Sequence, residues 1–179
     1  MIVYSENEQD HIKTVDEVFC RFRDEAMRIN KDKSEFLRGS VKFLGRIFDC
    51  RGMSPSNEYA VKIQDWPTPN TGKQLRQFLG LVNYLHQFIP GLADATGPLS
   101  TLTSTPGRQK LQWSAEHQSA FQEIKRIARV PMSLTTPVPG IGYTLETDAS
   151  NIAIGGVLKQ GNQLVAVYSK KLNTCKQIR

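Results

Sequence analysis

The sequence contains few cysteines and no long apolar run. Its three cysteines, Cys20, Cys50 and Cys175, lie far apart and show no paired-ligand spacing, which argues against a disulfide scaffold or a zinc knuckle. No stretch approaches the roughly 18 apolar residues of a membrane span, and the N-terminus lacks a basic region followed by an apolar core. We therefore expect an intracellular protein, cytoplasmic or nuclear, that is not secreted and has no membrane partner.

Acidic residues are outnumbered by basic ones and are missing from the last part of the chain. The 179 residues include 23 Lys and Arg against 17 Asp and Glu, a net charge of +6, and no Asp or Glu follows Asp148. A basic surplus favours polyanions such as nucleic acid as partners, without identifying one. With 39% hydrophobic and 22% charged residues, the composition is that of a folded protein of one domain or two small ones.

The N-terminal third predicts a helix followed by strands. Ser5–Glu8 has the form of a capping box, and an apolar stripe from Ile12 to Ile29 at helical spacing predicts an amphipathic helix whose stripe packs in a core. Residues 35–37 and 41–48 have the composition of two short strands, with Gly45 inside the second. A glycine there indicates either a plain bulge or the close approach of another backbone, as in a hairpin against a nucleic-acid strand. The residues leave both interpretations open.

The middle of the chain is predicted to be helical. Ser54-Pro55 supplies an N-cap and a first-turn proline for a helix to residue 63. Thr71–Gln74 forms a capping box for the next amphipathic helix, and a short helix or turn follows over residues 92–102. Ser114 caps a third amphipathic helix with Lys125 on its outer side. Prolines at 131, 137 and 139 then predict a stiff extended link, where we expect a domain boundary.

The last segment predicts an antiparallel three-stranded meander over residues 143–147, 154–159 and 164–169, with a tight turn at Gly161-Asn162. The first strand is expected to be at least half buried and ends on Asp148. A carboxylate at that position suits a hard cation such as Mg²⁺, or it caps its own backbone in a turn. Glu146 shares its face but is interpreted as an ordinary solvent-facing residue.

The chain contains, in order, the blocks Val41-Lys-Phe-Leu-Gly45, Trp66-Pro-Thr-Pro69, Leu75-Arg-Gln-Phe-Leu-Gly-Leu81 and Thr147-Asp-Ala-Ser150. Together they resemble the reverse transcriptase region of a gypsy-type retrotransposon polyprotein. Val41-Lys-Phe-Leu-Gly45 resembles the hairpin that grips the primer end, and Trp66-Pro-Thr-Pro69 resembles the link from palm to thumb. Leu75-Arg-Gln-Phe-Leu-Gly-Leu81 resembles the thumb, and Trp113-Ser114 resembles the start of the connecting helix. Thr147-Asp-Ala-Ser150, with Tyr168-Ser-Lys170, resembles the first strands of a ribonuclease H domain.

The resemblance implies an α+β fold in three parts. Residues 1–53 would be the end of the polymerase palm with its primer-grip-like hairpin, residues 54–137 the helical thumb and connection, and residues 138–179 a truncated ribonuclease H-like domain. It implies RNA–DNA hybrid or other nucleic acid, and the rest of the polyprotein, as partners. It also implies Asp148 as the first catalytic, Mg²⁺-binding acid. The implied nucleic-acid-binding residues are Phe43, Leu44, Gly45, Arg46, Lys73 and Arg76.

Both acid clusters of the family are expected to be incomplete in this chain. The family's Tyr-x-Asp-Asp polymerase turn would precede Ile2, and the remaining ribonuclease H acids would follow Arg179, so Mg²⁺ binding is expected to be weak or absent. Two functions fit: a piece of a retroelement enzyme that is inactive alone, or a decayed or co-opted module that binds nucleic acid or a partner. The meander would lack its covering helices, so self-association through its exposed sheet is also expected.

Overall fold

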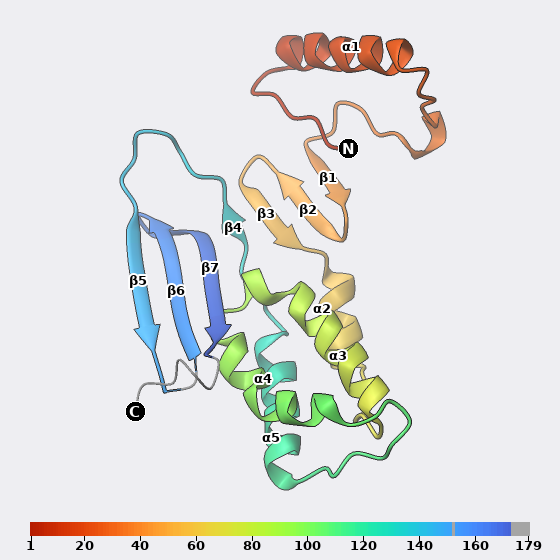
Figure 1. Cartoon of the computed structure of the whole chain (residues 1–179). Helices are drawn as coiled ribbons and strands as arrows, with labels where there is room; N and C mark the ends of the chain where they lie inside the picture. Colours follow the sequence, from red (N-terminus) through yellow and green to blue (C-terminus); the bar gives the residue numbers. More distant parts are fainter. Residues whose placement is uncertain (152, 173–179) are drawn as a thin grey trace.

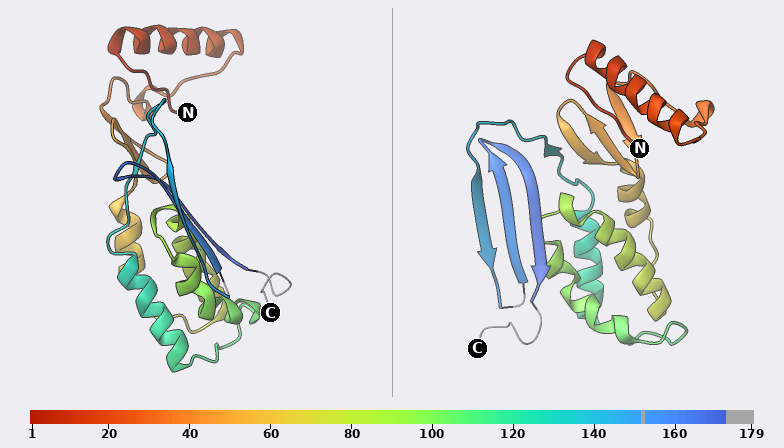
Figure 2. Two further views of the ribbon diagram at one scale, coloured as in Figure 1. Left: turned by 90° about the vertical axis from the view of Figure 1, so that its left-hand side faces the viewer. Right: turned by 45° about the horizontal axis from the view of Figure 1, so that its top comes forward.

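The computed structural model describes residues 1–151 and 153–172, and it mixes helices with two separate antiparallel sheets (Figures 1 and 2). None of the described helices is long and apolar enough to cross a bilayer. The α-helices are α1 (Glu8–Asp24), α2 (Asn57–Gln64), α3 (Gly72–Tyr84), α4 (Leu92–Ser100) and α5 (Ala115–Ile127), and the 3-10 turns are η1 (Lys31–Lys33), η2 (His86–Phe88) and η3 (Thr101–Ser104).

The first sheet is built on a hairpin with its turn at residues 44–45, where the sequence predicted one strand over residues 41–48 and left open a bulge or the close approach of another backbone. Its strands are ordered β1 (Ser40–Phe43), β2 (Arg46–Asp49), β3 (Gly52–Pro55) and β4 (Leu134–Thr135). Leu44 and Gly45 form the β1–β2 turn with φ of +48° and +75°, and a glycine adopts such values without steric cost. The prediction of a strand at residues 35–37 was wrong, and so was that of a helix cap at Ser54-Pro55, because these two residues end β3 and Ser56 precedes α2.

Strand β4 returns the chain to this sheet from a segment that was predicted to be only an extended link. Met53 pairs with Leu134, and Gly52 pairs with Thr135. Gly52 has φ of +143°, and a Cβ at this position would overlap the Leu134 carbonyl oxygen. Only a residue without a side chain therefore allows β4 to lie this close to β3.

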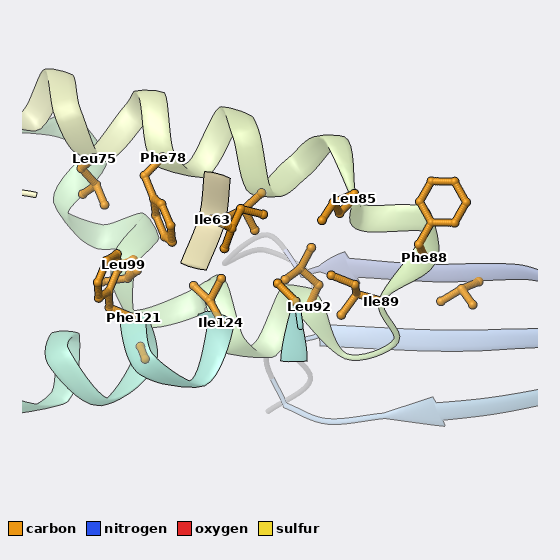
Figure 3. Packing of buried hydrophobic residues seen from close by; sticks show 14 of the residues in the cluster. Ile63, Leu75, Phe78, Leu85, Phe88, Ile89, Leu92, Leu99, Phe121 and Ile124 are labelled. Atoms are coloured by element: carbon orange, nitrogen blue, oxygen red, sulfur yellow. The ribbon is translucent and has the colours of Figure 1, made fainter. Parts of the chain in front are cut away.

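The helices α2–α5 enclose the main hydrophobic core. Figure 3 shows side chains of α3 and α5 pointing toward one another, and the rings of Phe78 and Phe121 have centroids 4.8 Å apart. Burying a side chain of this size stabilises the fold by roughly 1.5–3 kcal/mol. The stripes predicted for α3 and α5 are confirmed, since Leu75, Phe78, Val82, Phe121 and Ile124 are all buried.

Of two predictions about polar residues of α5, one is confirmed and the other is wrong. The Ser114 cap of α5 is confirmed, and His117 completes its capping box. Lys125 was placed on the outer side of α5, but its Nζ donates to the carbonyl oxygens of Gln64 at 2.8 Å and Trp66 at 2.6 Å. The half-buried ammonium thus satisfies carbonyls at the C-terminal end of α2 and ties that end to α5.

Helix α1 lies apart from this core (Figures 1 and 2). Its N-cap is Asn7, whose side chain accepts from the Asp10 amide, and not the predicted Ser5. The prediction that its apolar stripe is core was wrong, because no residue of α1 is buried. The stripe contacts a short loop, where the rings of Phe19 and Phe36 meet edge to face with centroids 5.9 Å apart. Correct periodicity therefore predicted the helix but not its burial.

The second sheet confirms the predicted meander. Its strands β5 (Thr144–Ala149), β6 (Ala153–Gln160) and β7 (Gln163–Lys171) pair in that order, with the turn at Gly161. Every residue of β5 is exposed, so the expectation of a half-buried strand was wrong. Buried Gln160 binds the preceding segment, because its Nε2 donates to the carbonyl oxygens of Val138 at 2.9 Å and Ile141 at 3.0 Å.

The sheet contacts the helices through β7, while β5 lies on the far side (Figures 1 and 2). His86 Nε2 lies 2.7 Å from the Ser169 carbonyl oxygen, and the Ala93 amide donates to Ser169 Oγ at 3.2 Å. Lys171 Nζ donates to Ser100 Oγ at 2.7 Å. Val167 of β7 is buried within the main core, so this edge of the sheet is packed as well as hydrogen-bonded.

Candidate nucleic-acid interface and acidic site

The turn of the β1–β2 hairpin rests on two stacked tyrosine rings. Tyr59 of α2 and Tyr84 at the end of α3 stack with centroids 4.1 Å apart and an interplanar angle of 16°. The Tyr84 hydroxyl donates to the Leu44 carbonyl oxygen, and the Ser56 amide donates to the Gly45 carbonyl oxygen at 3.0 Å. Both carbonyls of the turn are therefore bound from outside the hairpin, which fixes the turn against the ends of two helices.

The residues of the predicted primer-grip-like segment have different environments. Leu44, at the tip, has an exposed fraction of 76%. Phe43 is half-buried, and Gly45 lies against the tyrosine pair. A large apolar side chain held in solvent by a fixed turn can contact a sugar or a base edge, whereas Gly45 admits the rings beneath it. The hairpin thus has one exposed apolar residue at its tip, Leu44, and one glycine, Gly45, that its seating on the rings requires.

Arg46 is already engaged within the protein. Its guanidinium lies over the rings of Tyr84, at 5.6 Å from the centroid, and Phe88, at 5.9 Å. Its Nη1 lies 3.8 Å from Met53 Sδ. When the side-chain amide of Gln87 is oriented with its oxygen toward Arg46, this oxygen accepts from Nη2 at 2.9 Å. Such stacking stabilises the hairpin against α3 and η2. The predicted contact of Arg46 with nucleic acid stays a prediction.

Lys73 and Arg76 lie near the N-terminal end of α3, about 12–16 Å along the helix axis from Tyr84 at 1.5 Å per residue. Arg76 Nη1 donates to the carbonyl oxygens of Thr103 and Thr105, each at 2.8 Å, and so holds the following loop. The Lys73 side chain is exposed. The structure thus places these two predicted contacts at the opposite end of α3 from the hairpin turn.

Asp148 lies near the end of β5 and is exposed. Its Oδ1 accepts from the amide of Ala149 at 2.9 Å, while the Ser150 amide donates to the Ala153 carbonyl oxygen at 2.9 Å to close the turn. Asp148 pairs across the ladder with Gly155, which adds no side chain beside the carboxylate. The carboxylate is therefore open to solvent and makes a local backbone contact of the kind expected for a cap.

Glu146 does not join Asp148 in a shared site. Lys159 Nζ donates to both of its carboxylate oxygens at 2.7 Å. Within residues 1–151 and 153–172 there is no group of three or more His, Cys, Asp or Glu that could hold a metal ion. A pair of Mg²⁺ ions needs several oxygen ligands, so the described residues around Asp148 do not fit a two-ion centre.

The predicted residues fall into separate places, and several of the residues that organise them had no signal in the sequence. The hairpin turn contacts the end of α3 at Tyr84, whereas Asp148 belongs to β5, the strand of the second sheet that lies farthest from the helices (Figure 1). Tyr59 and Tyr84 are 15 and 40 residues from Leu44, and periodicity assigns neither to the turn. The Glu146–Lys159 pair follows from the observed β5–β6 register, in which the two residues are diagonal neighbours. The sequence predicted both strands but not this register.

Comparison with known proteins connects these parts. Residues 113–179 match the family described as the RNase H-like domain found in reverse transcriptase. Over 178 residues the chain is 35% identical to the transposon Tf2-3 polyprotein of Schizosaccharomyces pombe, covering 97% of this chain and 13% of that polyprotein. The chain thus spans a small part of the curated relatives that it matches.

Two solved structures share the fold over nearly the whole chain. The foamy viral protease-reverse transcriptase in complex with an RNA/DNA hybrid superposes with a TM-score of 0.79 at 26% identity, over 96% of this chain and 24% of that one. The foamy viral protease-reverse transcriptase dRH in complex with double-stranded DNA superposes with a TM-score of 0.81 at 25% identity. This match covers 97% of this chain and 31% of that one. The chain is therefore homologous to the reverse transcriptase–RNase H region of retroelement polyproteins, and residues 113–179 match its RNase H-like domain.

Proposed function

We propose that this chain is a nucleic-acid-holding part of a retroelement reverse transcriptase and RNase H. In this proposal the whole polyprotein carries out RNA-directed DNA synthesis and cleavage of the RNA–DNA hybrid inside the cell, in the cytoplasm or nucleus. The observation that carries it is the similarity, over 96% of the chain or more, to reverse transcriptases whose structures contain an RNA/DNA hybrid or double-stranded DNA.

In this proposal the three parts of the chain have different tasks. Residues 1–53 belong to the palm and present the hairpin, residues 54–137 form the thumb and connection, and residues 138–179 begin the RNase H-like domain. The seating of the hairpin turn on the ends of α2 and α3 supports a palm and thumb that move as one body at this contact. The contacts of β7 with η2 and α4 support a similar junction for the RNase H-like part.

The proposed contacts with nucleic acid combine an apolar tip with basic side chains. Leu44 and Phe43 would lie against the sugar or base edge of a bound strand, at a turn that Gly45 permits. Lys73, and more weakly the engaged guanidinia of Arg46 and Arg76, would neutralise phosphates. Phosphate contacts make binding dependent on salt and independent of sequence.

Catalysis by these residues alone is not part of the proposal. Asp148 would be the first acid of the RNase H set and would hold Mg²⁺ together with acids from elsewhere in the polyprotein. In this chain its strand neighbour Glu146 is neutralised by Lys159, which supports weak or absent binding of Mg²⁺ by the isolated chain. Asp148 is thus proposed as one ligand of a shared site.

The alternative is a decayed or co-opted copy that binds a partner without catalysis. The observation that favours it is the exposed apolar outer face of the second sheet, where Leu145 is 65% and Tyr168 is 51% exposed. Either the rest of the polyprotein or a second copy of the chain would cover this face. Genomic sequence separates the two functions, because an active element encodes Tyr-x-Asp-Asp upstream and the remaining acids downstream, whereas a decayed copy has stop codons there.

The experiment that tests the proposal is binding and cleavage of a labelled RNA–DNA hybrid by the 179-residue chain. We expect the natural chain to bind the hybrid, and to bind it more weakly as salt is added. At low salt, Lys73→Gln should bind the hybrid more weakly than the natural chain does. We expect no cleavage with Mg²⁺ or Mn²⁺. Cleavage by the natural chain that disappears in Asp148→Asn would contradict the proposed inactivity, and absence of binding at low salt would contradict the proposed function.

A further inference from the structure

We infer that Tyr84 is a positioning residue for the nucleic-acid-facing turn of the hairpin, and that it acts through the Leu44 carbonyl oxygen. This inference rests on the proposed function of the hairpin. Tyr84 lies outside the strands of the hairpin, at the last position of α3, 40 residues along the chain from Leu44.

The turn depends on contacts from outside because of its own geometry. Leu44 has φ of +48°, a value that non-glycine residues adopt only at some cost, and Gly45 follows with φ of +75°. The Ser56 amide binds the Gly45 carbonyl oxygen and the Tyr84 hydroxyl binds that of Leu44. The contact from Ser56 is made by a backbone amide, whereas that from Tyr84 is made by a side chain. The Tyr84 contact holds Leu44, the turn residue whose own side chain is exposed.

The Tyr84 ring is itself held by two neighbours. Tyr59 stacks on it at 4.1 Å between centroids, and the guanidinium of Arg46 lies 5.6 Å from its centroid. A Cβ added at Gly45 would lie 2.5 Å from Tyr59 Cε2 and 2.8 Å from the Tyr84 hydroxyl oxygen. The rings therefore form a fixed support directly beneath the turn, and the Tyr84 hydroxyl points from that support to the Leu44 carbonyl.

This contact is suited to orienting the tip more than to stabilising the whole protein. The hydrogen bond is exposed, so water replaces it at little cost when it is lost. Its loss frees a turn residue in a left-handed conformation, and Leu44 is 76% exposed, so its side chain packs little against the described part of the chain. Removal of the hydroxyl should therefore change the position of Leu44 while leaving the melting temperature nearly the same.

The test compares two matched variants of the full chain. Tyr84→Phe keeps the stacked ring and removes the hydroxyl, and we expect the Kd for a labelled RNA–DNA hybrid to rise by about three- to tenfold. Tyr59→Phe removes the same atom from the other ring of the pair, whose hydroxyl has no hydrogen bond to the turn in the described residues, and we expect a smaller loss. An equal loss in both variants would overturn the inference, because the effect would then belong to the ring pair and not to the Leu44 contact.

A double-mutant cycle provides the readout that a merely structural role would not change. If Tyr84 acts by orienting Leu44, Tyr84→Phe should add little to the loss caused by Leu44→Ala. Independent, additive losses would overturn the inference. If Leu44→Ala itself leaves hybrid binding unchanged while the natural chain binds, the hairpin contact of the proposed function fails, and the inference fails with it. If Leu44→Ala weakens binding and Tyr84→Phe does not, the inference alone fails.

Discussion

His86 Nε2 lies 2.7 Å from the carbonyl oxygen of Ser169 and joins the helical part of the chain to the edge strand of the second sheet. Ser169 is buried, and its hydroxyl accepts from the Ala93 amide, so this residue is bound on two sides. Two residues before His86, the Tyr84 hydroxyl binds the hairpin turn. Residues 84–86, which connect the end of α3 to η2, therefore contact both the proposed nucleic-acid-facing turn and the RNase H-like sheet.

We expect His86→Ala to lower the free energy of unfolding by about 1–3 kcal/mol, because it leaves a buried carbonyl oxygen without its donor. His86→Gln, which keeps a side-chain donor, should recover part of this loss. Urea denaturation gives the free energies, and amide exchange along β7 locates the change. Equal stability of His86→Ala and the natural chain would show that water replaces this contact without cost.

We expect Gly52→Ala to separate β4 from β3. A Cβ at this position overlaps the Leu134 carbonyl oxygen, and the φ of +143° suits only glycine, so the loss should be about 2–4 kcal/mol. Gly39→Ala is the matched control, because nothing lies within 4 Å of its added Cβ, and its effect should stay within about 0.5 kcal/mol. Similar denaturation midpoints for the two variants would argue against the β3–β4 pairing.

The ion pair between Lys42 of β1 and Glu58 of α2 predicts a pH dependence in the seating of the hairpin. The Lys42 ammonium, by hydrogen bonding and by its charge, holds the pKa of Glu58 below its ordinary value of 4.5. A lowered folded-state pKa stabilises the fold above pH 4.5, and this contribution is lost as the pH falls through the folded-state pKa.

The natural chain should therefore have a slightly higher urea midpoint than Glu58→Gln at pH 7, and the two should converge as the pH falls below 4.5. Because both side chains are largely exposed, added salt should reduce the difference at pH 7. A difference that stays constant from pH 7 to acid would show that Glu58 contributes through packing and not through its charge.

The outer face of the second sheet should bind a hydrophobic dye in the isolated chain. This face forms an apolar groove lined by residues that include Leu145, Leu158 and Tyr168. Leu145→Lys should reduce dye fluorescence by about twofold, and it should also reduce any dimer seen by sedimentation. Val61→Lys is the control, since Val61 is 55% exposed on α2, away from the sheet. Equal dye fluorescence of the natural chain, Leu145→Lys and Val61→Lys would contradict the expectation that the outer face of the second sheet is accessible to the dye.

The sequence predicted well those features that depend on local periodicity. The stripes of α3 and α5 became core, and the alternation after residue 143 became the meander, because each pattern has a partner within the chain. The stripe of α1 has the same spacing but packs on a short loop, so none of its residues is buried. Burial depends on what lies opposite a helix face, and periodicity does not contain that information.

The candidate site was less predictable for the same reason. For Gly45 the sequence left a bulge and a close approach of another backbone open, but its close neighbours are the rings of Tyr59 and Tyr84. Arg46 and Arg76 were recognised as basic residues near the proposed ligand, but the contacts that engage their guanidinia come from residues distant in sequence or from backbone carbonyls. Residue type indicated the chemistry, whereas the partners depended on tertiary contacts.

Hydrogen exchange of the 179-residue chain, measured with and without a saturating RNA–DNA hybrid, shows whether the hairpin turn contacts nucleic acid. We expect the hybrid to slow exchange at the amides of the hairpin turn, residues 43–46, and near Lys73 at the start of α3. The outer face of the second sheet should stay unchanged. Slower exchange confined to residues 144–169, or unchanged exchange at the hairpin when the hybrid is bound, would contradict a contact between the hairpin and nucleic acid.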